Sequence, residues 1–291
     1  MSKSTAKQRQ AHREQTTAAA LETLHTGLEA LTSSETWKAM LRTAASFHTY
    51  SPNNYLLIWA ESLGRETAPQ MPVASFNRWK KLGRNVRKGE KAYRVWAPIR
   101  KKERDEETGE ETERVVTFKL VPVFTYDQTE GEPIELPQPP KLPEGNDEYG
   151  AWDALERLVL ADPAWTITRE QSRDGENGWT DFDSQTINVS ADLDLAAAAK
   201  TLAHELAHRR LHASLGRSYR RQDVRSRAEV EAESTAYVVM NALGLDVAEY
   251  SLDYVAGWAE GDLDAVKETV TTVLTTARSI LADLEDGAQA A

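Results

Sequence analysis

Three of the six histidines in this chain lie within nine residues, in the run TLAHELAHRRLH. His204, Glu205 and His208 form the pattern His-Glu-x-x-His on a predicted helix. Histidines at positions i and i+4 lie about 6 Å apart along one helix face, so both imidazoles can bind one zinc ion while the glutamate reaches the water on that ion. The pattern therefore predicts a hydrolytic zinc site with Glu205 as general base, and a plain polar helix surface is the alternative.

A helix over about 224–243 offers the third ligand. Glu229 and Glu233 lie one turn apart on a face that also carries Ala232, whereas Glu231 points to the opposite side. Small side chains beside an acid let this helix approach the histidine helix closely. We therefore predict Glu229 as the third zinc ligand and Glu233 as the carboxylate that orients a ligand histidine through its free ring nitrogen. A solvated acidic face is the alternative.

The predicted site is His2Glu plus water, which is the open geometry of a catalytic zinc site. The chain contains no cysteine, so a Cys-ligated metal, a thiol nucleophile and a disulfide framework are all excluded. Zinc is favoured over manganese. His212 lies about 12 Å from His204 along the helix axis, and we interpret it as a structural residue.

The elements that must hold these residues follow from the hydrophobic pattern of the second half of the chain. A helix over about 192–215 carries the histidines on one face and leucines on the opposite face. A helix over 152–160 and short strands in the runs WTITRE, WTDFD and TINV precede it. The last helix has an apolar stripe over 263–284, which is interpreted as a packing face, with a dimer interface as the alternative.

The first half of the chain is organised differently. Helices are predicted around residues 21–31 and 37–47, and shorter ones over 53–63 and 75–82. A long hairpin follows, with strands in the runs YRVWAPI and RVVTFKLVPVFTY. The proline-rich run GEPIELPQPPKLPEGND predicts a linker, so the predicted domains are 1–131 and 148–291, joined by residues 132–147.

Positive charge is concentrated in the first domain. The chain has a net charge of −11, yet residues 75–102 hold eleven Lys or Arg against one acid, which leaves −21 for the remainder. Aromatic residues are interleaved with these cations, although Phe76 and Trp96 are individually expected to be core residues. Cations that follow phosphates and aromatics that stack on bases are typical of proteins that bind single-stranded nucleic acid.

Three runs in this half carry a family resemblance: FHTYSPNNYLLIWAES, SFNRWKKLGRNVRKGEKAYRVWAPI and VFTYDQTEGEPI. Over about residues 35–135 they resemble the N-terminal single-stranded-DNA-binding domain of the ArdC family of plasmid antirestriction proteins. The resemblance, together with the cations, implies these DNA-binding residues: Asn53, Asn54, Tyr55, Arg78, Trp79, Lys80, Lys81, Arg84, Arg87, Lys88 and Lys91.

The resemblance also implies the domain order, because ArdC proteins pair this domain with a C-terminal zinc-metallopeptidase-like domain. The runs HELAHRRLH and EVEAESTA resemble the ImmA/IrrE-type peptidases at least as much. Both patterns have an acid three residues before an alanine, which corresponds to Glu229 before Ala232. The expected fold is therefore α+β: a helical and β-hairpin domain that binds single-stranded DNA, then a mostly helical zincin-like domain with a small sheet.

The leading expectation is an ArdC-like antirestriction protein of a mobile genetic element, with one zinc ion and a metallopeptidase domain. One alternative is a non-catalytic DNA-binding protein with a structural metal. Another is an ImmA/IrrE-like regulatory peptidase that cleaves a DNA-associated repressor or a restriction subunit. The polar N-terminus and the absence of an apolar run of about 18 residues predict a cytoplasmic protein with neither a secretory signal nor a membrane span.

Overall fold

The structure is a computed structural model that describes residues 6–47, 50–65, 68–104, 111–135, 150–171, 175–214, 222–245, 259 and 261–290. The chain divides into two compact units: Met1–Gly27 with Asn53–Pro137, and Leu28–Pro52 with Gln138–Ala291. Helices and small sheets occur in both units, so the α+β class expected from the sequence is confirmed at this level. Within the described ranges, no helix is long and apolar enough to cross a membrane.

The first unit is built around a long antiparallel hairpin, as predicted. Strands β3 and β4 pair along most of their length, with a register shift between Ile99 and Arg100. Two sheets are described here, β1-β4-β3 and β2-β5. The elements of this unit are α1 (Ala6–Ala30, divided by the boundary at Gly27), α3 (Pro52–Ser62), β1 (Val73–Ala74), α4 (Phe76–Lys81), β2 (Arg84–Val86), β3 (Tyr93–Arg104), β4 (Glu111–Thr125) and β5 (Thr129–Gly131).

Helix α3 closes the outer edge of strand β3. The side-chain amide of Asn54 accepts from the backbone N–H of Trp96 at 2.7 Å and donates to its carbonyl at 3.0 Å. Two residues earlier on β3, the backbone N–H of Arg94 donates to the carboxylate of Glu61 at 3.1 Å. These side chains satisfy backbone groups that a neighbouring strand would otherwise pair with. They therefore have a structural task in holding helix and hairpin together.

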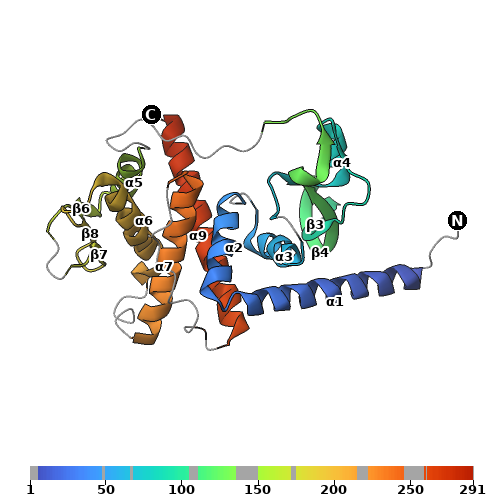
Figure 1. The fold of residues 1–291 in the computed structure, drawn as a ribbon, viewed down its shortest axis with the longest axis horizontal. Helices are drawn as coiled ribbons and strands as arrows, with labels where there is room; N and C mark the ends of the chain where they lie inside the picture. The colour runs from blue at the N-terminus through green and yellow to red at the C-terminus, as the bar shows by residue number, and fades with distance from the viewer. Residues whose placement is uncertain are drawn as a thin grey trace. The chain divides into compact units, whose positions relative to one another are not determined.

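The second unit combines a helical bundle with a small mixed sheet. Its sheet has the order β6-β8-β7, with β6 parallel and β7 antiparallel to the central β8. Helix α6 packs against α7 on one side and against β7 and β8 on another (Figure 1). The elements are α2 (Ser34–Ala45), α5 (Ala151–Leu160), β6 (Thr166–Thr168), β7 (Gly178–Asp181), β8 (Thr186–Val189), α6 (Leu195–His212), α7 (Gln222–Ala242) and α9 (Leu263–Ala290).

Local sequence explains where α6 begins and how closely the sheet approaches it. Asp194 is the N-cap, and its carboxylate accepts from the backbone N–H of Ala197 at 2.8 Å. Gly178 on β7 faces the helix: a Cβ there would lie 2.6 Å from Thr201 Cγ2 and 2.8 Å from the Asn188 carbonyl oxygen. Only glycine therefore lets β7 lie this close to the helix that carries the histidines.

Helix α2 belongs to a different unit from the one that the predicted domain boundaries gave it. We expected residues 1–131 to form one domain, yet Leu28–Pro52 belongs to the second unit. Trp37 is fully buried there, and its indole N–H donates to Ser234 Oγ on α7 at 2.9 Å. The helix predicted around residues 37–47 is present as α2, but the helix it packs against lies far along the chain. Most of the predicted linker 132–147 lies outside the described residues.

Replacing Trp37 with alanine should therefore destabilise the second unit by about 3–5 kcal/mol, the usual cost of deleting a buried tryptophan. Urea unfolding of the whole protein, followed by circular dichroism, measures the loss. Trp179→Ala is the matched control, because Trp179 is 42% exposed. Equal stability losses in the two variants would contradict the assignment of α2 to this unit.

Candidate metal centre

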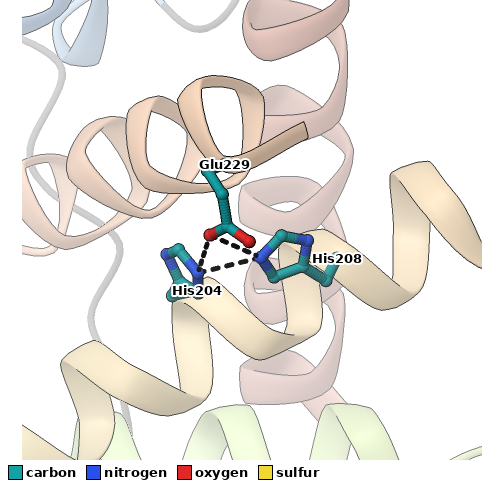
Figure 2. A group of neighbouring side chains, drawn as sticks. All are labelled: His204, His208 and Glu229. Carbon is teal, nitrogen blue, oxygen red and sulfur yellow. Dashed lines mark hydrogen bonds and ion pairs between the residues drawn. The ribbon is translucent and has the colours of Figure 1, made fainter. Parts of the chain in front are cut away.

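Three side chains from two helices converge in the second unit. His204 and His208 project from one face of α6, and Glu229 projects toward them from α7 (Figure 2). The Nε2 atoms of the two histidines are 2.9 Å apart, and each lies 3.4 Å from Glu229 Oε2. The structure thus brings together the three residues that the sequence predicted as metal ligands.

The donor set has the spacing of a metal site. Ligand atoms about 2.0–2.1 Å from a tetrahedral zinc ion lie roughly 3.3–3.4 Å from one another. Two of the separations here are 3.4 Å and the third is 2.9 Å, so a small adjustment accommodates an ion. The side chain of His208 is 5% exposed, whereas that of Glu229 is 44% exposed. The cluster is therefore buried on the α6 side and open on the Glu229 side, as a catalytic site requires.

The carboxylate of Glu229 lies between two histidines whose pKa values are shifted in opposite directions. Burial lowers the pKa of His204, but its hydrogen bonds to Glu229 and Glu233 outweigh burial and raise that pKa to about 10. Burial and the neighbouring histidines lower the pKa of His208 to about 4, despite the opposing contact with Glu229. Burial raises the pKa of Glu229, yet the hydrogen bonds from both histidines lower it overall. A metal ion therefore meets an ionised carboxylate and competes with a proton on His204.

Each histidine of the cluster has a polar partner at its second ring nitrogen. His204 Nδ1 lies 2.8 Å from Glu233 Oε2, the contact expected of a carboxylate that orients a ligand histidine. His208 Nδ1 lies 3.0 Å from His212 Nδ1. The two rings are thus held from behind while both Nε2 atoms face Glu229.

Glu205 faces the sheet side of α6 and is held by strand β7. It is 5% exposed, and its Oε2 accepts a hydrogen bond from the Thr180 hydroxyl at 2.7 Å. Burial raises the pKa of the Glu205 carboxyl, against the lowering effects of His204 and Thr180. A buried carboxylate with a raised pKa, next to the first histidine of the cluster, has the properties of a general base.

Removing the hydroxyl of Thr180 tests how firmly Glu205 is held. Thr180→Val keeps the shape and the strand preference of the side chain but leaves a buried carboxylate without this donor. We expect a loss of about 1.5–3 kcal/mol in the free energy of unfolding, the usual contribution of a hydrogen bond to a charged group. Urea denaturation at neutral pH measures it. Thr180→Ser retains the hydroxyl, so equal stability of the Val and Ser variants would contradict the role of the contact.

The predicted DNA-binding residues divide into two groups in the first unit. One group is exposed and carries the positive charge expected of a phosphate-binding surface. Arg87 in this group pairs with Glu90 at 2.8 Å. The exposed residues are Asn53 at the start of α3, Arg78, Lys80 and Lys81 on α4, and Arg87, Lys88 and Lys91 after β2.

The other group has structural contacts, so the prediction of DNA contact is corrected for its members. Tyr55 and Trp79 are 1% and 0% exposed, and the indole N–H of Trp79 donates to the Phe124 carbonyl. Arg84 is buried, with its guanidinium bound to Thr129 Oγ1 and to the carbonyls of Thr129, Gly131 and Glu132. The amide of Asn54 holds β3. None of these four side chains presents a free polar end or an aromatic face to a ligand.

Phe76 is more exposed than predicted. We expected a core residue, but Phe76 is 52% exposed, and its ring meets Phe124 edge-on at 6.5 Å between centroids. Trp96, the other aromatic expected in the core, is half-buried. Phe76 is therefore the aromatic side chain on α4 that is available for stacking, beside the exposed cations of the same helix.

Comparison with known proteins finds a family match in the N-terminal part of the chain. Residues 10–124 match the family model described as the N-terminal domain of anti-restriction factor ArdC. A metal-free crystal structure of the antirestriction ArdC protein from plasmid R388 is similar over 83% of this chain and 86% of its own length, with a TM-score of 0.53 and 24% identity. The chain is an ArdC-like protein.

Two further matches extend over most of this ArdC-like chain. The Mn(II)-bound structure of the same plasmid R388 protein covers 82% of this chain and 85% of its own, with a TM-score of 0.52 and 22% identity. These two structures show a shared fold. An uncharacterized protein of Bacillus anthracis is 26% identical over 81% of this chain, and the chain spans 46% of that relative's length.

Three contacts of the metal centre were not predicted from the sequence. His212 was interpreted as structural, although its position four residues after His208 repeats the spacing that identified the first pair. Glu231 was assigned to the far side of α7, yet its Oε2 lies 3.1 Å from His212 Nε2. Thr180 had no signal in the sequence, because only the pairing of β7 with β8 and its packing on α6 bring it to Glu205.

Proposed function

We propose that this ArdC-like protein is a metal-dependent peptidase that binds single-stranded DNA and protects entering DNA from restriction in the cytoplasm. The observation that carries the proposal is the convergence of His204, His208 and Glu229 beside Glu205, in a chain whose residues 10–124 match the ArdC N-terminal domain. The C-terminal unit is proposed to be zincin-like on the same ground. The Mn(II)-bound relative supports a divalent ion at this site, and two imidazole ligands favour zinc.

The chemistry follows from the side chains at the site. His204, His208 and Glu229 would hold the ion, which supplies Lewis acidity to a scissile carbonyl. Glu205 takes the proton of the attacking water and delivers it to the leaving amine. Its burial favours both steps, because a raised pKa brings a carboxylate closer to the operating pH. Thr180 keeps the carboxylate in one orientation throughout.

Strand β7 supports a peptide rather than a small molecule as substrate. Among the described strands, β7 pairs on one side only, with β8, so its other edge carries backbone groups that an extended chain can pair with. Thr180 joins this strand to Glu205. A peptide added to the edge of β7 would therefore run alongside the metal cluster.

The exposed cations of the first unit support DNA binding. Removing Lys80, Lys81 and Lys88 together should weaken binding of single-stranded DNA and reduce the slope of log affinity against log salt by about 2, since each phosphate contact contributes roughly 0.7. Fluorescence anisotropy with a labelled oligonucleotide at several salt concentrations measures both. The triple alanine variant of Lys38, Lys200 and Lys267 in the second unit removes the same charge and should bind normally. Equal slopes in the two variants would contradict this surface.

The whole proposal is tested by delivering unmodified plasmid DNA into cells that carry a restriction enzyme. Expression of the protein should raise the number of recipients that keep the plasmid, and should have no effect in cells without the restriction enzyme. Purified protein should bind about one divalent ion and cleave an unfolded protein substrate only when that ion is present. Failure of protection, metal binding and DNA binding together would reject the proposal.

A further inference from the structure

A line of polar side chains continues from the metal cluster into α7. His208 Nδ1 lies 3.0 Å from His212 Nδ1, and His212 Nε2 lies 3.1 Å from Glu231 Oε2. The other oxygen of Glu231 accepts from Arg227 Nε at 2.8 Å. His208, His212 and Glu231 are 4%, 2% and 7% exposed. This relay, His208-His212-Glu231-Arg227, is buried as far as Glu231 and lies on the opposite side of His208 from Glu229.

The hydrogens of the relay run in one direction. The guanidinium of Arg227 donates from Nε to Glu231 Oε1 at 2.8 Å, and this ion pair keeps Glu231 a carboxylate, which only accepts. His212 Nε2 must then carry a hydrogen. In neutral His212 the remaining nitrogen, Nδ1, is an acceptor, so the hydrogen between the two rings belongs to His208 Nδ1. His208 is left with a lone pair on Nε2, the atom that faces His204 and Glu229.

We infer that His212, held by Glu231 and Arg227, is a positioning residue that fixes His208 in the tautomer able to bind a metal. The inference rests on the metal site of the proposed function. For His204, the carboxylate of Glu233 does this directly, because it accepts the hydrogen of His204 Nδ1. Without His212, the carboxylate oxygen Glu229 Oε2, 3.4 Å from His208 Nε2, can accept the ring hydrogen and favours its placement on Nε2. That tautomer has no lone pair to offer an ion at this position.

Two substitutions of His212 separate tautomer control from simple packing. His212→Leu is close in volume and has no acceptor, so metal affinity should fall by about 10- to 100-fold, as it does when outer partners of metal ligands are removed. His212→Gln offers an oxygen to His208 and an amide hydrogen to Glu231, so affinity should return to within a few-fold of wild type. Competition with a chromophoric chelator measures both. Equal losses in the two variants, or no loss in either, would overturn the inference.

A single atom exchange in Glu231 should reverse the relay. In Glu231→Gln, Arg227 holds the amide oxygen, so the NH2 group faces His212 and donates to its Nε2. His212 then carries its hydrogen on Nδ1 and donates to His208, which forces the hydrogen of His208 onto Nε2. Metal affinity should fall at least as far as in His212→Leu. Glu268→Gln, which alters the exposed second partner of Arg227 at 3.6 Å, is the matched control and should bind metal normally.

Nitrogen-15 NMR of metal-free protein tests the tautomer without any metal. Wild-type His208 should carry its hydrogen on Nδ1, and Glu231→Gln should move it to Nε2. An Nε2 hydrogen on His208 in the wild type would overturn the inference. If the wild type shows the Nδ1 hydrogen but binds no divalent ion, the proposed function fails while the relay stands.

Discussion

Replacing Glu205 by glutamine should lower metal-dependent peptide hydrolysis by about 10²- to 10⁴-fold, the range that general acid–base catalysis contributes. The amide keeps the size of the side chain and can still accept from Thr180, which donates to Glu205 Oε2 at 2.7 Å. It cannot take up the proton of the attacking water. Metal content should remain at wild-type level, because Glu205 is outside the cluster of three ligand atoms. Cleavage of a fluorogenic unfolded protein, with metal analysis of the same samples, measures both quantities.

Glu170→Gln is the matched control, since it makes the same chemical change at an exposed carboxylate of the same unit. It should cleave at the wild-type rate. The plasmid-protection assay then separates the remaining functions. Full hydrolysis by Glu205→Gln with metal bound would contradict the role of Glu205 as general base. Full protection with hydrolysis lost would assign antirestriction to DNA binding, with the metal as a structural ion. A protein fragment that appears in cells only with wild type would favour a regulatory peptidase.

The residues of the metal centre could be predicted where the geometry is internal to one helix. The spacing of His204 and His208 places them on one face of α6 whatever surrounds the helix. The choice of Glu229 needed one further step, namely that small residues beside an acid allow two helices to approach. The relay behind His208 depends on the register of α6 against α7, which no local pattern contains, so Glu231 was assigned to the wrong side.

The aromatic residues of α4 show why the DNA-contact prediction was wrong for some positions. Phe76 and Trp79 lie one turn apart in a helix of six residues, which is too short for its hydrophobic period to define an inward face. Trp79 is buried against β4, where its indole N–H donates to the Phe124 carbonyl. Arg84 is buried for a similar reason, since the carbonyls that bind it lie some 45 or more positions further along the chain. Exposure of a cation or an aromatic is thus a tertiary property.

Chain order misled the assignment of α2 in the same way. An apolar stripe indicates which face of a helix is buried, but it does not indicate which other element that face packs against. The hydrogen bond from Trp37 to Ser234 joins positions 197 residues apart. The domain boundary was predicted from the proline-rich composition of residues 132–147. Composition indicates where a chain is extended, but it does not indicate which helices pack together, so it could not predict this contact.

Glu229→Gln should raise the dissociation constant of the metal by more than about 100-fold, beyond the range of 10- to 100-fold for outer partners of metal ligands. The substitution preserves size but removes the negative charge that the ion would neutralise. It also leaves the two histidine Nε2 atoms without the carboxylate that both approach at 3.4 Å. Chelator competition at fixed pH measures the affinity, and metal analysis after dialysis measures the stoichiometry, which should fall well below one.

The rank order of three amide substitutions makes this prediction specific to ligation. Glu233→Gln weakens the support of His204 without removing a ligand, so its loss should stay within about 10- to 100-fold. Asp286→Asn makes the same change on the exposed side of α9 and should leave affinity unaltered. A general electrostatic effect would give all three variants similar small losses. If Glu233→Gln were instead the most damaging, Glu233 would be the third ligand, and the contact at 2.8 Å with His204 would need to rearrange when the ion binds.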